Sequence, residues 1–255
     1  MKIIKKNKSF TITDFSIVDK YKYSEYSRND EDTGRTYNVG EEKIPSVTTI
    51  LSKTQSQEKI ESLDRWRDKV GYQEAARITN QAASRGTEMH YVLEQYCRGR
   101  GYLNLSDNGS LPRMMAHTVV DNLEKLSEVW GSEVNLQYSD YCPSLYPNPK
   151  KIAWAGCTDL VGLYDDQPTI IDFKQANKPK REEWIEDYYY QIAAYAIAHK
   201  HNHGPITQGL ICVCTKDLVY QEFKMTEDMI LEYEHKWFER TYKYYKKVNT
   251  SSPKV

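Results

Sequence analysis

The chain has 255 residues, of which 39% are hydrophobic and 28% are charged, and its formal net charge is −1. This composition is typical of a folded globular protein and excludes a disordered chain. The near-zero charge excludes a protein that is basic over its whole surface, so any nucleic-acid site must be a local basic patch. No apolar run approaches the roughly 18 residues of a membrane helix. The basic start "MKIIKKNKSF" lacks the apolar stretch of a secretory signal, so we expect neither feature.

The cysteines favour a reducing compartment. There are 5 of them, an odd number, and none forms a C-x-x-C pair. Reduced thiols in a cytosolic protein are the simplest interpretation. Cys212 and Cys214 share one side of an apolar strand-like run, which favours a buried structural pair over a metal site. The 21 tyrosines and 5 tryptophans are either packing residues or platforms for stacked bases.

The first half of the chain predicts irregular β structure followed by helices. "SRNDEDTGR" (27–35) has the composition of a turn or loop. "IPSVTTIL" (44–51) predicts a short helix that enters at Pro45 and Ser46. Further helices are expected at 57–70, 72–83, 84–99 and 113–130.

The second half predicts a sheet with two more helices. Strands are expected at 133–140, 151–157, 159–165, 169–174, 208–215 and 218–224. Residues 165–168 predict a hairpin turn. Helices are expected at 182–200 and from a cap at Thr226 to about 247. This order indicates an α/β or α+β enzyme with a mixed sheet.

An acid and a lysine interrupt the apolar run in "TIIDFKQANK" (169–178). Asp172 and Lys174 are two apart, so on a strand they face the same side, where burial is costly unless compensated. If the preceding strand forms a hairpin with this one, Asp159 lies near Asp172. Two carboxylates and a backbone carbonyl suit Mg²⁺ or Mn²⁺, and Lys174 could orient a water there. The alternative is a partly buried ion pair, with Asp159 in a turn.

The helix that begins at "SRGTEMHY" carries polar groups beside its apolar stripe. His90 and Glu94 are four apart and share one side. Arg85, Gly86 and Thr87 open this helix, with a glycine that allows close approach and a hydroxyl near the positive helix end. The alternative for His90 is a histidine satisfied in the core or at the surface.

"YYYQIAAYAIA" places a glutamine within an apolar helix. Gln191 and Tyr195 are four apart, and such a glutamine needs a hydrogen-bond partner. That partner is either an internal network, or Lys174 or a phosphate. The loop "KQANKPKR" clusters cations, among them Lys178, and is either a solvated loop or a patch that grips a nucleic-acid backbone.

Four of these segments, in this order, resemble the PD-(D/E)XK nuclease superfamily in its RecB-like branch. They are "RGTEMHYVLEQY", "AGCTDLVG", "IIDFK" and "YYYQIAAYA", which match H, G-x-x-D, D-x-K and Q-x-x-x-Y. "IPSVTTIL" is similar to an N-terminal motif of the mitochondrial genome maintenance exonuclease group and its phage relatives. The resemblance covers about residues 44–200.

The resemblance implies roles for individual residues. The implied metal ligands are His90, Asp159, Asp172 and the backbone carbonyl of Phe173. Lys174 would activate or position the attacking water, Gln191 and Tyr195 would hold the lysine region and the strand, and Glu94 would support His90. The candidate DNA contacts are Ser46, Thr48, Thr49, Arg85, Thr87, Lys178 and Tyr195.

Some positions depart from the family pattern. No proline precedes the first acid, and Gln175 stands where many relatives have Thr or Ser, which puts that contact in doubt. Some relatives hold an iron–sulfur cluster through one early and three late cysteines, but no cysteine here follows Cys214, so we expect no cluster. Mg²⁺ is the expected ion, and Mn²⁺ is expected to substitute because of the histidine ligand.

The predicted fold is a restriction-endonuclease-like α/β (α+β) core, with a central mixed β-sheet flanked by helices and an N-terminal helical segment. Residues 1–43 are expected to form a β or irregular extension. Residues 44–255 are expected to form a single nuclease domain, with a helical part at 44–130 and the catalytic sheet and helices at 131–255.

The predicted function is a metal-dependent DNA exonuclease that prefers single strands or DNA ends and acts in replication, recombination or repair. We expect it in the cytoplasm, which is the host's if the source is viral. Two alternatives remain open: a DNA-binding module of nuclease fold that does not cut, and a structure-specific endonuclease.

Overall fold

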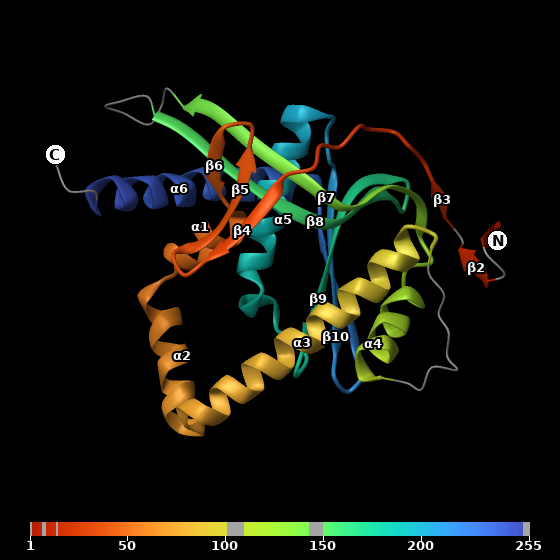
Figure 1. The fold of residues 1–255 in the computed structure, drawn as a ribbon, viewed down its shortest axis with the longest axis horizontal. Coiled ribbons are helices and arrows are strands. Elements are labelled where there is room, and N and C mark those ends of the chain that lie inside the picture. The colour runs from red at the N-terminus through yellow and green to blue at the C-terminus, as the bar shows by residue number, and fades with distance from the viewer. Residues whose placement is uncertain (1, 7–8, 14, 101–109, 143–149, 252–255) are drawn as a thin grey trace.

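In the computed structural model, which describes residues 2–6, 9–13, 15–100, 110–142 and 150–251, a six-stranded mixed sheet forms the centre (Figure 1). The strand order is β11-β10-β9-β8-β7-β3. β7, β8 and β9 form an antiparallel meander, β10 lies parallel to β9, and β11 returns antiparallel. The strands are β3 (Ser16–Ile17), β7 (Leu126–Cys142), β8 (Lys150–Tyr164), β9 (Gln167–Ala176), β10 (Gln208–Thr215) and β11 (Tyr220–Met225).

Helices cover both faces of this sheet. One buried core joins α1, α5 and α6 to the sheet, and another joins α4 and the second half of α3 to it. The arrangement confirms the predicted restriction-endonuclease-like α+β fold. The helices are α1 (Val47–Lys53), α2 (Gln57–Val70), α3 (Tyr72–Cys97), α4 (Leu111–Val120), the 3₁₀ helix η1 (Glu182–Trp184), α5 (Glu186–Asn202) and α6 (Glu227–Ser251).

The N-terminal region forms two small sheets. Arg35 Nε donates to Asp30 at 2.7 Å across the β4–β5 pair, and Lys43 of β6 pairs with Glu31 of β4 over the strand between them. These charge pairs hold a polar three-stranded sheet together. The turn or loop predicted at 27–35 is therefore wrong for most of this segment, and only residues 32–33 form a turn. The strands are β1 (Lys2–Lys6), β2 (Ser9–Thr13), β4 (Ser27–Glu31), β5 (Gly34–Val39) and β6 (Glu42–Pro45).

The helix start predicted near residue 84 is wrong, because α3 is continuous from Tyr72 to Cys97. Gly86 lies inside it, where a Cβ would come within 3.2 Å of the Gln175 side chain, so this glycine marks a close approach of α3 to β9. Thr87 is not at a helix end, and its hydroxyl donates to the Ala83 carbonyl at 3.1 Å.

Two other boundaries differ from the prediction. The strands expected at 151–157 and 159–165 are one strand, β8, because no turn residue interrupts it and β7 pairs along its length. The helix expected at 113–130 ends at Val120, and β7 begins at Leu126.

The turn between β8 and β9 is confirmed. Asp165 and Asp166 have φ values of 54° and 59°, the left-handed conformation that a two-residue hairpin turn requires. The predicted cap of α6 is also confirmed, since the Thr226 hydroxyl accepts from the Met229 N–H at 3.4 Å.

An aromatic cluster anchors the segment before β4 on α5. Tyr23 Oη lies 3.1 Å from His199 Nε2, and His199 Nδ1 lies 2.6 Å from the Gly204 carbonyl. Nδ1 therefore donates to the carbonyl and Nε2 accepts from the tyrosine, as a neutral imidazole requires. Tyr21 packs edge-on against both Trp130 and His199. Burial lowers the pKa of His199 to about 4.

We predict that His199 makes the protein less stable in mild acid. The unfolded histidine binds a proton near pH 6.5, but the folded one resists it down to a pKa of about 4. The stabilisation is complete above the unfolded pKa and is lost as the pH falls toward 4. Between pH 7 and 5 this group should remove about 2 kcal/mol of unfolding free energy. Urea denaturation of wild type and His199→Asn measures this, and parallel pH curves would contradict it.

Candidate active site

The two predicted acids lie where β8 and β9 stop pairing. The last pair of these strands, counted away from their turn, is Leu160 with Ile171. Asp159 comes immediately before Leu160 in the sequence, and Asp172 comes immediately after Ile171. From there β8 stays paired with β7 and β9 stays paired with β10, so the strands diverge without losing all their partners. The Phe173 N–H donates to Asp159 Oδ2 at 2.6 Å across the opening. Asp159 and Asp172 therefore lie at the same opening, where both line one cavity and the charge of Asp159 helps to raise the pKa of Asp172.

Side-chain alternation along β9 directs the charged pair to one side. Ile171 and Phe173 join the core under α3 and α4, so Asp172 and Lys174 face the α5 side. Asp172 is 4% exposed and forms an ion pair with Lys174. The Lys174 ammonium also lies 5.1 Å from the centre of the Tyr188 ring.

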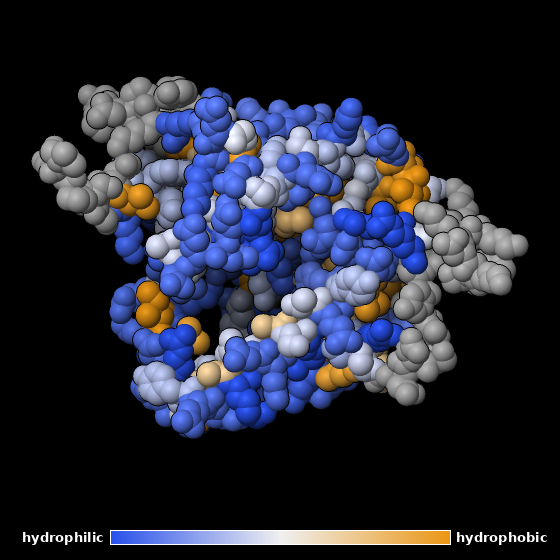
Figure 2. All heavy atoms as spheres, in the orientation of Figure 1, coloured by the Kyte–Doolittle hydropathy of each residue, from blue (hydrophilic) through white to orange (hydrophobic). Residues whose placement is uncertain are grey.

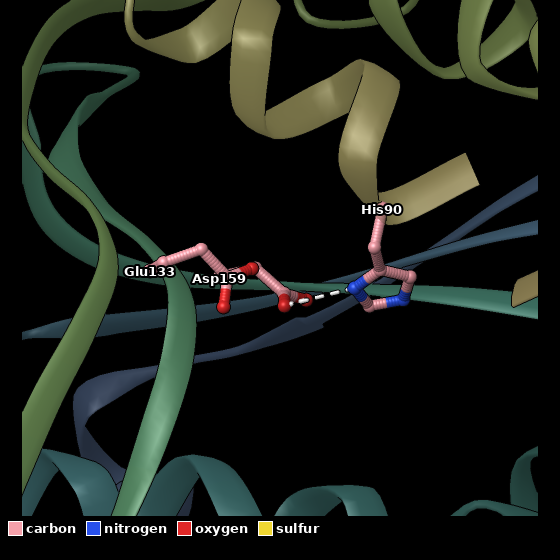
Figure 3. A group of neighbouring side chains, drawn as sticks. All are labelled: His90, Glu133 and Asp159. Atoms are coloured by element: carbon pink, nitrogen blue, oxygen red, sulfur yellow. Dashed lines mark hydrogen bonds and ion pairs between the residues drawn. The ribbon is translucent and has the colours of Figure 1, made fainter. Parts of the chain in front are cut away.

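A histidine and a further acid complete the group. His90 extends from α3, and its Nδ1 lies 3.0 Å from Asp159 Oδ1 (Figure 3). Glu133 comes from β7, with a φ of 55° inside the strand. Ligand atoms of His90, Glu133 and Asp159 all lie within 4.8 Å of one another. The Cys157 thiol donates to the Glu133 carboxylate at 3.3 Å.

The electrostatics of this group favour an added cation. Burial opposes the charge of Asp159, but His90 and Lys174 outweigh it and lower the pKa of this acid. Burial raises the pKa of Asp172 despite Lys174, and burial together with Asp159 raises that of Glu133. Burial opposes the charge of Lys174, but the two aspartates outweigh it and raise the pKa of this lysine. More acid is gathered here than the local cations neutralise.

The residues present fit a divalent metal ion. An imidazole and carboxylate oxygens form a donor set suited to Mn²⁺ and, through the oxygens, to Mg²⁺. The buried Oδ2 of Asp172 contacts Lys174 but has no oriented hydrogen bond among the described residues. The His90–Glu133–Asp159 group could hold a metal, and the predicted ligand Asp172 lies beside this group without being part of it.

A cavity of about 630 Å³ opens above these side chains. Figure 2 shows the surface hollowed between the α2–α3 pair and the rest of the molecule. The walls come from α3, α5, β7, β8, β9, the β4–β5 hairpin and the start of α1. The polar lining includes Arg28, Arg35, Ser46, Thr48, Thr87, His90, Glu94, Glu133, Asp159, Asp172, Lys174, Gln175 and Gln191, and Tyr37, Tyr91 and Tyr195 add aromatic rings.

Small residues let the walls approach. A Cβ at Gly156 would lie 2.6 Å from Tyr195 Cε1, so only glycine at this position leaves room for the ring. Gln191 and Tyr195 both line the cavity and are 8% and 4% exposed. The Gln175 side chain accepts from Arg85 Nε at 3.0 Å, so the amide oxygen of Gln175 is held by α3.

Several predicted contacts lie elsewhere. Thr49 donates to the Arg35 carbonyl at 2.8 Å, and Arg85 is held by Gln175 and Asn177. Glu94 lines the cavity but pairs with Arg98 at 2.8 Å rather than with His90. Phe173 contributes its N–H to Asp159, while its side chain is buried. Lys178 is exposed on the loop after β9.

The sequence interpretation missed Glu133, Arg28 and Arg35. Glu133 begins an alternating run in which Val134 and Leu136 are buried, so its place on the polar face could have been predicted. The arginines lay in the segment assigned as a loop, which concealed their shared face.

The comparisons with known proteins agree with the motifs. No protein-family model matches the chain. Proteins named mitochondrial genome maintenance exonuclease 1 match it at 30% identity over 216 residues in Xenopus tropicalis and 26% over 219 residues in Homo sapiens, each over 80% of this chain. The Mus musculus protein is 28% identical over 224 residues and 82% of this chain. The chain spans only 58%, 59% and 62% of the lengths of these three relatives.

A solved structure from Eubacterium rectale aligns over 66% of this chain and 69% of its own, with 14% identity and a TM-score of 0.43, which is too low to support a function. Over the described residues, the helices are all too short or too polar for a membrane span. In sequence, the chain is a relative of the mitochondrial genome maintenance exonucleases, the group that its motifs predicted.

Proposed function

We propose that the protein is a metal-dependent DNA exonuclease that hydrolyses phosphodiester bonds. The observation that carries this is the meeting of Asp159, Asp172, Lys174 and His90 at the floor of one cavity. The names of the sequence relatives support exonuclease action on DNA. The process served would be replication, recombination or repair.

The proposed metal ligands are His90, Asp159, Asp172 and the Phe173 carbonyl, with Glu133 added from the geometry. Mg²⁺ is the proposed ion, and Mn²⁺ is the proposed substitute. Either ion, when bound, would polarise the phosphate and lower the pKa of a water molecule.

The protein side chains would position the reactants. The Lys174 ammonium, held by Asp172, would orient the attacking water and stabilise the charge that develops on the phosphate. Gln191 and Tyr195 would fix the lysine side of the cavity and contact the strand. Direct attack by water would invert the configuration at phosphorus.

A preference for single strands or free ends is proposed from the shape of the cavity. α2 has no buried residues, and it leads into α3 at the edge of the hollow (Figure 2). Tyr91 lines the cavity and is 61% exposed, so its ring is available for stacking on a base. Thr48 and Thr87 line opposite walls and are proposed contacts to the strand. Ser46 is buried and caps α1, so its proposed part is to position Thr48. Thr49, Arg85 and Lys178 remain candidates for contacts outside the cavity.

We also propose that residues 44–255 act as one nuclease domain, which 1–43 extends. The free thiols of Cys97, Cys157, Cys212 and Cys214 are compatible with the cytoplasm, of the host if the source is viral. The rival is a module that binds DNA without cutting. The intact set of acids and lysine argues against it, since binding alone has no need for all three.

The first prediction from this function concerns Lys174. Lys174→Ala should lower the rate of strand hydrolysis by about a hundredfold or more, because charge stabilisation at the phosphate is lost. Lys224→Ala is the matched control, since Lys224 pairs with Asp165 outside the cavity. Single- and double-stranded DNA labelled at either end, and a closed single-stranded circle, would be digested with Mg²⁺, Mn²⁺ or chelator.

Spared circles and metal-dependent loss of linear strands would identify an exonuclease. Cut circles would indicate an endonuclease. Wild-type protein that binds DNA but cuts nothing with any metal would refute the nuclease and support a module that only binds DNA.

The second prediction concerns metal binding. Mn²⁺ at about 100 times its Kd should stabilise the wild type by about 2.7 kcal/mol, seen as a raised Tm. Asp159→Asn should abolish this shift and Glu133→Gln should reduce it. Without metal, Glu133→Gln should be at least as stable as wild type, because burial and Asp159 both disfavour the charge of Glu133. Asp159→Asn should be less stable without metal, because His90 and Lys174 stabilise the charge of Asp159.

Glu94→Gln is the control for metal binding, since Glu94 lines the same cavity but pairs with Arg98. Scanning calorimetry with and without Mn²⁺ measures all of these shifts. An unchanged Mn²⁺ shift in Asp159→Asn would refute the proposed ligand set.

A further inference from the structure

We propose that Arg28 and Arg35, side by side on the β4–β5 hairpin, bind a phosphate of the nucleic-acid strand while the neighbouring phosphodiester lies over the carboxylates. This inference rests on the proposed function for its substrate class. It gives the N-terminal hairpin, which none of the motifs includes, a part in holding the substrate.

The strand register places both arginines on one face. Arg28 lies opposite Tyr37, and Asp30 lies opposite Arg35. Cross-strand partners share a face, as do residues two apart on a strand, so these four side chains point the same way. Arg28, Arg35 and Tyr37 all line the cavity that contains the acids. The opposite face carries the Asn38 amide, which donates to Ser27 Oγ at 2.9 Å.

The hairpin is firmly joined to the catalytic sheet. Tyr37 is 3% exposed and packs with Ile44, Ala153 and Ala155 of β6 and β8. Ser46 forms a parallel bridge to Ala155, only four residues before Asp159. The arginine-bearing face is therefore positioned against the acids by packing.

The backbone of Arg35 is fixed independently of its side chain. Its carbonyl accepts from the Ser46 N–H at 3.0 Å and from the Thr49 hydroxyl at 2.8 Å. At Gly34, a Cβ would lie 2.7 Å from Thr49 Cγ2, so the turn approaches α1 closely. Truncating the Arg35 side chain should therefore leave this connection intact.

One carboxylate orients both guanidinium groups. Arg28 Nη2 lies 2.9 Å from Asp30 Oδ2, and Arg35 Nε lies 2.7 Å from Asp30 Oδ1. Two positive charges share one negative charge, which leaves one positive charge uncompensated. The side chains of Arg28 and Arg35 are 53% and 38% exposed, so they retain access to a ligand.

The cavity is therefore divided by charge. Its acids gather on the floor, while the hairpin side carries the two arginines and the hydroxyl of Thr48. Ser46 is buried and caps α1, and its hydroxyl oxygen lies 2.9 Å from that of Thr48. Guanidinium and hydroxyl donors are suited to phosphate oxygens, and a guanidinium can donate two parallel hydrogen bonds. Such contacts fix the register of a strand without reading its sequence.

The experiment measures single-stranded oligonucleotide binding by fluorescence anisotropy with chelator present, over a range of salt. Arg28→Ala and Arg35→Ala should each weaken binding by about tenfold. Each should also make the slope of log affinity against log salt shallower by about 0.7. Lys43→Ala is the matched control, because Lys43 lies opposite Asn38 on the other face of the same small sheet.

Two additions separate binding from folding and locate the phosphate. Arg28→Lys and Arg35→Lys should recover the salt slope but only part of the affinity, because lysine lacks the planar fork. Oligonucleotides with a 5′-phosphate, a 3′-phosphate or neither are compared. A loss that is equal for all three identifies an internal phosphate, and a loss confined to one identifies a terminal phosphate.

Arginine variants with the affinity and salt slope of Lys43→Ala would overturn the inference. A wild type that binds through these arginines but cuts nothing would support it while refuting the exonuclease. A wild type that cuts, with arginine variants unchanged in binding and KM, would support the exonuclease and refute the role of the arginines.

Discussion

The constraint on which the site depends is the divergence of β8 from β9 beyond the Leu160–Ile171 pair, on the side away from their turn. Buried carboxylates cannot occupy a fully paired sheet interior without losing solvation, and unpaired backbone groups are costly as well. Here β7 and β10 keep the backbone of the separated strands hydrogen-bonded, while the gap accommodates Asp159 and Asp172. The β7–β8 and β9–β10 pairings thus limit the free-energy cost of the local opening between β8 and β9.

The remaining walls reach this opening because small residues let them do so. Gly156 makes space for the Tyr195 ring, and Gly86 lets α3 cross close to Gln175. α3 then carries His90 to Asp159 at the opening between β8 and β9, although its neighbour Met89 is buried in the core. One helix therefore serves two purposes: its apolar stripe fixes its position, and the adjacent stripe delivers the imidazole.

The part of the site that follows local rules could be predicted from sequence. Two-residue periodicity placed Asp172 beside Lys174, and a short hairpin turn brought Asp159 to them. The errors came where tertiary packing overrides local signals. Gly86 resembles a helix start but is a packing glycine, and the charges of 27–35 resemble a loop until their cross-strand pairs are seen. Glu133 required knowledge of which strand lies beside β8, which pattern alone did not supply.

The charge of the molecule acquires a meaning only when it is mapped onto this cavity. A net charge of −1 gives no long-range attraction for a polyanion. The acids on the floor come from the sheet, whereas Arg28 and Arg35 come from the N-terminal hairpin, so separate parts of the chain supply opposite charges. A phosphodiester carries a negative charge that acids alone would repel. In the proposed function, Arg28, Arg35 and a bound divalent ion would together reverse that repulsion where the strand lies over the carboxylates.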